Sequence, residues 1–463
     1  MAQTYDLTTG KVSRLILSFY FPMLFTNLLQ QVYTMADTAI IAKGLGDNAT
    51  AAVGNMASLT FLIIGFSTGL TNGFSVSVAQ NYGAKDYQRL RRAIASSIKL
   101  AVGITVLLTA FSVLVLKDIL ILLKTDPAIL KDSLLYGYII FGGLVTTIAY
   151  NMCAAILRAL GDSKTPLIAI IASSVINVML NSVTIFLMHT GVEGPAAATL
   201  IAQIVSALIC YLKIRRIEII RLTLKDFARD VRMYLNLMKN GIAMALMNSI
   251  TAVGSMVVQY FVNGLGLAYT SAYSICMRYL NLFMDPACTA GFTMSSFASQ
   301  NYGAKKYSRI NEGLKVCLGI AFLTYLVFGS VMVFMPETIA SFMLNESERI
   351  AIAVRFLPIY GVMMFAVDFL FVFRSAVQGM GFPFIPMCSG ILEMIMRIVV
   401  VVVLIKPLGF EATAYAGIAA WIAALLLNAG AYVVIIRRKL KEDSIALKKS
   451  GSGYQKGSLY LHS

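Results

Sequence analysis

The chain has 463 residues, of which 58% are hydrophobic and only 13% are charged, with a mean hydropathy of +0.78. Soluble domains are about half apolar and about a quarter charged, so this composition excludes an ordinary soluble protein and indicates an integral membrane protein. The net charge of +16 is explained by Lys and Arg gathered in the loops of one membrane side, and we expect no nucleic-acid partner.

Long apolar runs follow one another along the chain, each of the roughly 20 residues that a helix needs to cross a ~30 Å hydrocarbon core. We therefore predict an all-α membrane protein with twelve transmembrane helices. The first six spans are expected at about 14–41, 50–80, 93–120, 128–157, 165–188 and 194–214, and the second six at about 240–263, 268–299, 311–334, 350–378, 384–406 and 412–436.

These spans divide the chain into an N-lobe (1–213), a connector (214–239), a C-lobe (240–440) and a tail (441–463). Apolar residues recur at three- and four-residue steps along the connector, which predicts an amphipathic helix at the cytoplasmic interface. They are Ile217, Ile220, Leu224, Phe227 and Val231. The alternative is a regulatory or partner-binding linker. The tail is mostly polar, and we expect it to be disordered and cytoplasmic.

An internal repeat organises the chain. The hexapeptide Gln-Asn-Tyr-Gly-Ala-Lys occupies 80–85 and again 300–305, an offset of 220 residues. The same offset places Gly161 on Gly381 and the Gly-Leu-Gly at 44–46 on the one at 264–266. The protein is thus two tandem copies of one unit, and a site common to both lies most naturally in a central cavity between them.

The orientation of the two units follows from the span count and the loop charges. Six spans per unit is an even number, so the repeats are parallel, related by an axis along the membrane normal. Loops on one side are rich in Lys and Arg, which predicts that this side and both termini are cytoplasmic. The hexapeptides lie there, and we interpret them as turns that fix the junction between spans. These basic residues include Lys85, Arg89, Arg91, Arg158, Lys164, Lys305, Arg309 and Arg437.

The first span carries a polar stripe. Gln30, Tyr33 and Asp37 lie at i, i+3 and i+7, on one helical face. An ionisable group inside an apolar span is costly and usually faces a cavity or a partner. The stripe therefore suits a proton or cation site. The alternative is that Asp37 lies near the outer end of the helix and only faces water.

Asn177 and Asn181 lie four residues apart in span five, on one face, and each side chain can donate and accept hydrogen bonds. Hydrogen bonding between helices explains such residues equally well. Thr199 in span six and Asn151 in span four are weaker candidates taken alone.

In the second half, Asp368 lies in span ten, and Glu393 and Arg397 lie at i and i+4 in span eleven. The last two are candidates either for a substrate site or for a structural ion pair. The six cysteines have no metal-ligand spacing, and there are only two histidines. The chain also lacks a Gly-x-x-x-x-Gly-Lys-[Ser/Thr] phosphate loop. We expect no cofactor, no firm metal site apart from a Na⁺ position near Asp37, and no enzyme.

Together these features resemble the multidrug and toxic compound extrusion (MATE) family, which belongs to a wider exporter superfamily. The twelve spans, the two parallel halves and the paired hexapeptides carry the resemblance. So do the "RALGDSKTP" turn at 158–166 and its partner "QGMGFPFIP" at 378–386. The resemblance covers about residues 5 to 440.

The resemblance implies efflux of organic, often cationic, drugs or metabolites from a bacterial cell in exchange for H⁺ or Na⁺. It implies a cation-coupling site at Asp37 with Tyr33, Asn177 and Thr199. The family places an Asp where this chain has Asn181, so one carboxylate is missing there. Asp368 matches a second family site, but its usual partner is missing because span seven has no acid.

Gln30, Asn151, Glu393 and Arg397 are the remaining candidates, for contacts with the substrate. We expect a monomer surrounded by membrane lipids. Two alternatives stay open. A flippase for a lipid-linked precursor would be expected to carry a strongly cationic cavity, and a receptor or scaffold would be expected to carry a soluble domain.

Overall fold

The computed structural model describes residues 6–123 and 125–457, and this part of the chain is helical throughout apart from its turns. The N-lobe contains α1 (Val12–Gly83), α2 (Tyr87–Leu122), α3 (Pro127–Gly142), α4 (Leu144–Ala159), α5 (Lys164–Ser182) with a π-helical turn at Val183–Leu187, and α6 (Glu193–Arg215). The C-lobe contains α7 (Val231–Asn263), α8 (Leu267–Gly303), α9 (Tyr307–Thr324), a π-helical turn at Tyr325–Gly329, α10 (Ser330–Phe334), α11 (Pro336–Met343), α12 (Ser347–Gly379), α13 (Phe384–Leu408) and α14 (Glu411–Gly457).

These helices provide the twelve predicted spans. Nine helices of the described part are long and apolar enough to cross a membrane, and α3 and α4 together form a further span bent by 45°. Helix α1 has 72 residues and contains two spans, because the backbone turns at Gly46, where φ is 82°. The less apolar α8 completes the set. The predicted all-α, twelve-helix fold in two lobes is confirmed.

The two lobes repeat one another in backbone conformation. Gly161 and Gly381, which follow α4 and α12, have φ angles of 83° and 87°. Lys85 and Lys305, which end the two hexapeptides, both have φ of 58°. Such left-handed angles are uncommon outside glycine, so their recurrence at equivalent positions is strong support for two copies of one fold.

The connector is not the amphipathic helix predicted for residues 214–239. It forms two short 3₁₀ turns, Glu218–Ile220 and Leu224–Phe227, before α7 begins at Val231. Two acids interrupt a continuous helix, because Asp226 accepts hydrogen bonds from Thr223 and Asp230 caps the first turn of α7. Consequently Ile220 is buried while Leu224 is 92% exposed, and the apolar residues do not share one face.

Asp226 also attaches the connector to the N-lobe. Its carboxylate pairs with Arg91 of α2 at 3.6 Å. Burial raises the pKa of the Asp226 carboxyl, but the hydrogen bonds from Thr223 and the charge of Arg91 outweigh burial, so the pKa is lowered. The connector is therefore held to α2 while this group is ionised.

The tail begins as helix, which corrects the prediction of disorder. Helix α14 continues from the last span to Gly457. Glu442 binds Arg438 and Lys439 at 3.0 and 2.8 Å, and ion pairs at i, i+3 and i, i+4 support such an extension. Residues 458–463 of the predicted tail lie outside the described part of the chain.

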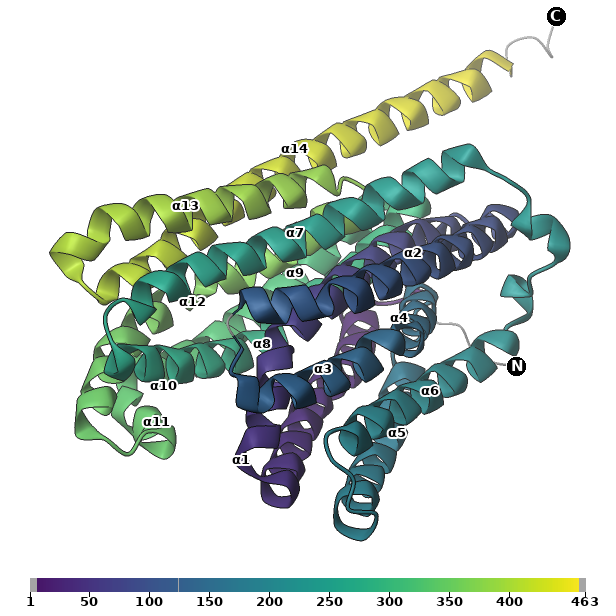
Figure 1. Cartoon of the computed structure of the whole chain (residues 1–463). Helices are drawn as coiled ribbons and strands as arrows, with labels where there is room; N and C mark the ends of the chain where they lie inside the picture. Colours follow the sequence, from purple (N-terminus) through teal and green to yellow (C-terminus); the bar gives the residue numbers. More distant parts are fainter. Residues whose placement is uncertain (1–5, 124, 458–463) are drawn as a thin grey trace, which may run out of the picture.

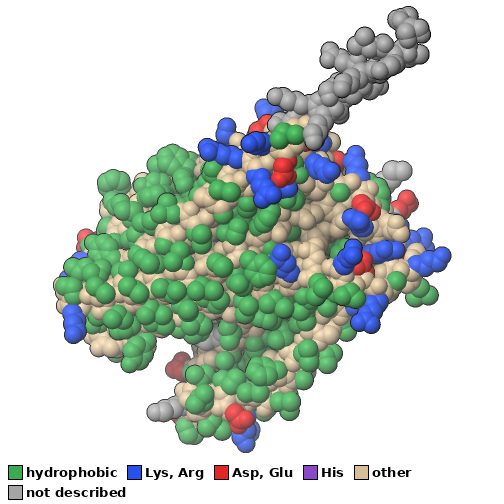
Figure 2. Space-filling view, turned by 90° about the horizontal axis from the view of Figure 1, so that it is seen from above, with side chains coloured by type: hydrophobic (Ala, Val, Ile, Leu, Met, Phe, Trp, Pro, Cys, Tyr) green, Lys and Arg blue, Asp and Glu red, His purple; other side chains and the backbone are tan. Residues whose placement is uncertain are grey.

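The lobes meet at one end of the molecule and diverge towards the other (Figure 1). Lys and Arg side chains gather around the end from which α14 projects, whereas hydrophobic side chains cover much of the flank (Figure 2). We call this end, which contains the turns at 83–87, 160–164, 303–307 and 379–384, the basic end. The surface is notched towards the end opposite to the one from which α14 projects (Figure 2), where the lobes diverge (Figure 1).

Candidate functional site

The first part of the site lies between α1, α5 and α6 of the N-lobe. Asn181 of α5 donates a hydrogen bond from Nδ2 to the Asp37 carboxylate of α1. The same nitrogen lies 2.9 Å from Oδ1 of Asn177, and Asn177 donates to Thr199 of α6 over 3.4 Å. Both asparagines are fully buried. Four of the residues predicted from the sequence thus form one continuous hydrogen-bonded chain.

Two tyrosines complete this group. Tyr33, one turn before Asp37 on α1, lies next to Thr199 and Asp37. Tyr136 of α3 lies close enough to interact with both Tyr33 and Asp37. Tyr136 was not predicted from the sequence, where it is one of two tyrosines, with Tyr138, in the same stretch of span four.

The side chains of this group offer oxygen atoms, rather than nitrogen or sulfur atoms, as possible ligands. Oδ1 of Asn181 is buried and has no hydrogen-bond partner within the described residues, and it belongs to the amide that contacts Asp37. Carboxylate, amide and hydroxyl oxygens suit a hard cation, and a single carboxylate can also bind one proton. The described residues contain no group of three or more His, Cys, Asp or Glu side chains placed to hold a metal ion.

The other two N-lobe candidates are separate from this chain of hydrogen bonds. Asn151 of α4 donates to Thr68 of α1 over 3.4 Å, which links two helices of the lobe. Gln30 is exposed on α1, about two turns before Asp37. Asn151 therefore has a structural partner, whereas Gln30 is free to contact a solute.

In the C-lobe, Glu393 has a different main partner from the one predicted. Arg374 of α12 donates a hydrogen bond to Oε1 of Glu393, whereas Arg397 approaches Oε2 at 3.7 Å. Arg397 also donates to Ser255 of α7. The predicted local pair is thus a buried cluster of two guanidinium groups and one carboxylate that joins three helices. Its charge is positive overall, so Glu393 does not supply free negative charge for an organic cation.

Asp368 is a further acid of the C-lobe. It is fully buried in α12, and neither carboxylate oxygen has a hydrogen-bond partner within the described residues. Cys288 of α8 interacts electrostatically with both Asp368 and Arg374, which places α8 beside this stretch of α12. An unpaired buried carboxylate is costly unless it is protonated or binds a cation, so Asp368 remains a candidate for ion coupling.

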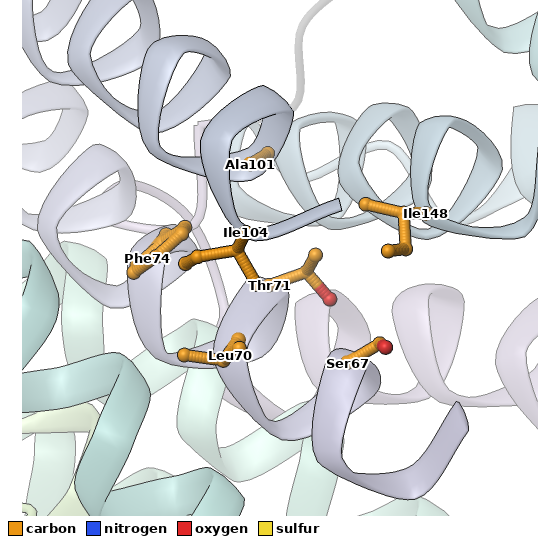
Figure 3. A pocket seen from close by; sticks show the side chains of 7 residues that line it. All are labelled: Ser67, Leu70, Thr71, Phe74, Ala101, Ile104 and Ile148. Atoms are coloured by element: carbon orange, nitrogen blue, oxygen red, sulfur yellow. The ribbon is translucent and has the colours of Figure 1, made fainter. Parts of the chain in front are cut away.

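A small pocket inside the N-lobe is distinct from both groups (Figure 3). The hydroxyls of Ser67 and Thr71 donate to backbone oxygens of their own helix, and the other lining side chains are apolar. The pocket is lined by Ser67, Leu70, Thr71, Phe74, Ala101, Ile104 and Ile148. None of the predicted site residues lies there, and we assign it to helix packing.

Comparison with known proteins identifies the family. The MatE family model matches this chain twice, at residues 22–183 and 243–403, in the same frame as the internal repeat to within one residue. The chain belongs to the MatE family. These are the multidrug and toxic compound extrusion transporters, and the resemblance seen in the sequence is confirmed.

Relatives and solved structures agree with this assignment. A Bacillus subtilis (strain 168) protein named "Probable multidrug resistance protein YoeA" is 30% identical over 356 residues, covering 74% of this chain and 75% of the relative. "Probable multidrug resistance protein YpnP" of the same organism is 27% identical, covering 66% and 69%. A crystal structure of MATE in the bent conformation has a TM-score of 0.90 at 19% identity, covering 96% and 100%.

The site departs from the pattern that the resemblance implied. The resemblance predicts an acid at the position of Asn181, and the structure places the Asn181 amide directly on Asp37. The N-lobe site therefore contains one carboxylate where two were expected. In the C-lobe, α7 has no acidic residue, so Asp368 has no acidic partner from that helix.

Proposed function

We propose that this MatE protein is a secondary exporter of small organic molecules, multidrug in range like its named relatives, driven by inward movement of H⁺ or Na⁺. The hydrogen-bonded group at Asp37 carries the proposal. Asp37 is the one acid among the residues of this group, and it lies on α1, a helix that reaches the region between the lobes. A cation bound there would favour one of two conformations, because it has different affinities for them.

We further propose that the basic end faces the cytoplasm of a bacterial cell membrane and that the lobes alternate between two openings. Lys and Arg concentrate at that end, which is the usual sign of the cytoplasmic side. The notch lies towards the end opposite to the one from which α14 projects, so the state described here would open to the outside. Rocking of two parallel repeats about a central site is a common transport movement.

We propose which residues contact the substrate from the exposure and the charge of their side chains. Gln30 is exposed near the N-lobe group, whereas the Glu393 carboxylate is buried and paired with Arg374. Organic cations would therefore depend on the N-lobe acid more than on the C-lobe cluster. The direct test is purified protein in lipid vesicles, with an imposed pH or Na⁺ gradient and a fluorescent organic cation. Gradient-independent flux, or none with either ion, would contradict the proposal.

Asn181→Asp provides a more specific test of the coupling site. The change puts a second carboxylate against Asp37, and two such groups at this distance do not easily ionise together without a cation. We expect the variant to show Na⁺-dependent transport, or a pH profile moved to higher pH, because one carboxyl then holds its proton more tightly. Asn48→Asp, at an exposed position of α1 outside the group, is the control. A profile equal to wild type would separate position 181 from coupling.

A further inference from the structure

The two lobes are joined at the basic end by a pair of equivalent hydrogen bonds. Gln80 at the end of α1 donates from Nε2 to the carbonyl oxygen of Gly379 in the C-lobe, at 3.1 Å. Gln300 at the end of α8 donates from Nε2 to the carbonyl oxygen of Ala159 in the N-lobe, at 2.8 Å. Donors and acceptors are each separated by the repeat offset, so each lobe gives one bond and accepts one.

The glycines of the two hexapeptides permit this contact. A Cβ atom built on Gly83 would overlap the backbone carbonyl of Gln300, and one built on Gly303 would overlap that of Gln80. The left-handed positions that end the hexapeptides are Lys85 and Lys305 instead. The two glycines are therefore required by the close approach of the lobes, and not by the φ angle of a turn.

A segment before the first span reinforces one of the two bonds. Residues 6–10 belong to the predicted N-lobe, but Leu7 is buried against the C-lobe, and its backbone N–H donates to Oε1 of Gln300 at 3.0 Å. Asn301 and Lys306 in turn donate to the carbonyl oxygens of Leu7 and Thr8, at 3.2 and 2.7 Å. We call residues 6–10 the arm. It fixes the Gln300 amide, which is fully buried, whereas Gln80 is half-buried.

We propose that Gln80, Gln300 and the arm form a latch that holds the basic end closed and thereby sets the balance between the two openings of the transporter. The inference rests on the alternating movement proposed above. Opening the basic end requires both bonds to break together, because each lobe contributes the donor of one and the acceptor of the other. Gln300 is the stronger element, since it donates to the opposite lobe and accepts from the arm.

The latch affects only how the two lobes are positioned relative to each other, so its test must measure conformation as well as flux. Spin labels at Gln88 and Ser308, two exposed residues separated by the repeat offset, report the distance between the lobes at the basic end. The labels are introduced after replacing the native cysteines, in a background with verified transport. Distances are measured in lipid vesicles with and without the ion gradient and the organic cation.

We expect Gln80→Ala, which removes one hydrogen bond, to increase the population with separated basic ends about five-fold, and Gln300→Ala, which removes two, to increase it further. Deletion of residues 2–9 should act in the same direction. Gly83→Ala should separate the ends most, because a methyl group cannot fit against the Gln300 carbonyl. Gln259→Ala, on α7 away from the hexapeptides, is the matched control and should leave the distances unchanged.

The possible outcomes distinguish the latch from the transport mechanism. If wild type interconverts between two distances but the Gln80, Gln300 and Gly83 variants keep the wild-type populations, the latch is overturned and the proposed function stands. If wild type transports while the basic ends never separate under any condition, alternating opening at this end is overturned, and the latch with it. Should Gln300→Ala not fold, the half-buried Gln80 variant still decides the matter.

Discussion

Vesicles that contain the Asp37→Asn variant are expected to show no ion-driven efflux above vesicles without protein. The substitution removes the acid of the N-lobe group, and with it the group that binds or releases the coupling ion. The fold should survive, because the new amide oxygen can still accept the hydrogen bond from Asn181. Transport of the fluorescent cation under a pH or Na⁺ gradient, at matched protein content, measures the effect.

The control is Asp118→Asn, which removes an exposed acid of α2 and should leave efflux at the wild-type rate. A second experiment measures substrate binding by the purified Asp37→Asn protein without a gradient. Binding with no driven transport places Asp37 in coupling. Full transport by the variant would contradict this role and would leave Asp368 as the candidate for ion coupling.

The second large effect is expected from the buried cluster in the C-lobe. Glu393→Gln should lower the free energy of unfolding by about 3–5 kcal/mol, because it leaves Arg374 and Arg397 buried without a counter-charge. Neutralising Glu393 and Arg397 together should remain strongly destabilising, since Arg374 still loses its partner. The triple change to Gln at all three positions should be much milder. Thermal unfolding of the purified protein in detergent gives the order of the variants.

A surface pair provides the comparison. Arg355 lies 3.4 Å from Glu411 with 56% of its side chain exposed, and Arg355→Gln should change stability by less than about 1 kcal/mol. Wild-type stability in the Glu393→Gln, Arg397→Gln double variant would mean that Arg374 does not depend on Glu393. Strong destabilisation of that double variant would instead support the structural alternative for Glu393.

The architecture was predictable because it depends on properties that the sequence displays directly. The lengths of the apolar runs predict the spans, the repeated hexapeptide predicts two copies, and the even number of spans in each copy predicts that they are parallel. Asp37, Asn177 and Asn181 were also accessible, because a polar residue within an apolar span is rare and costly. Their positions on single helical faces suggested a common direction, although only the packing of α1 against α5 brings Asp37 to Asn181.

The missed features depend on contacts between helices that lie far apart in the sequence. The spacing of Glu393 and Arg397 suggested a complete local pair, and nothing in the sequence indicated that α12 would bring Arg374 closer. Tyr136 reaches the N-lobe group for the same reason. The prediction for the connector was wrong for a different reason. Its apolar residues have helical spacing, but Asp226 and Asp230 form caps that interrupt a continuous helix.

The arm has a counterpart in the connector, and this has a consequence for how such a chain can arise. The repeat offset places Leu7 on Phe227, whose carbonyl accepts a hydrogen bond from Lys99 of the N-lobe. Each half thus extends the segment before its first span onto the other half, as protomers do when they exchange elements in a swapped dimer. The contacts themselves differ, because the repeat offset pairs Lys99 with Gly319. An exchange of this kind is what a fused pair of six-span units would retain, and the repeat offset pairs Asn181 with Val401 and Glu393 with Ser173, so the two halves differ at both groups.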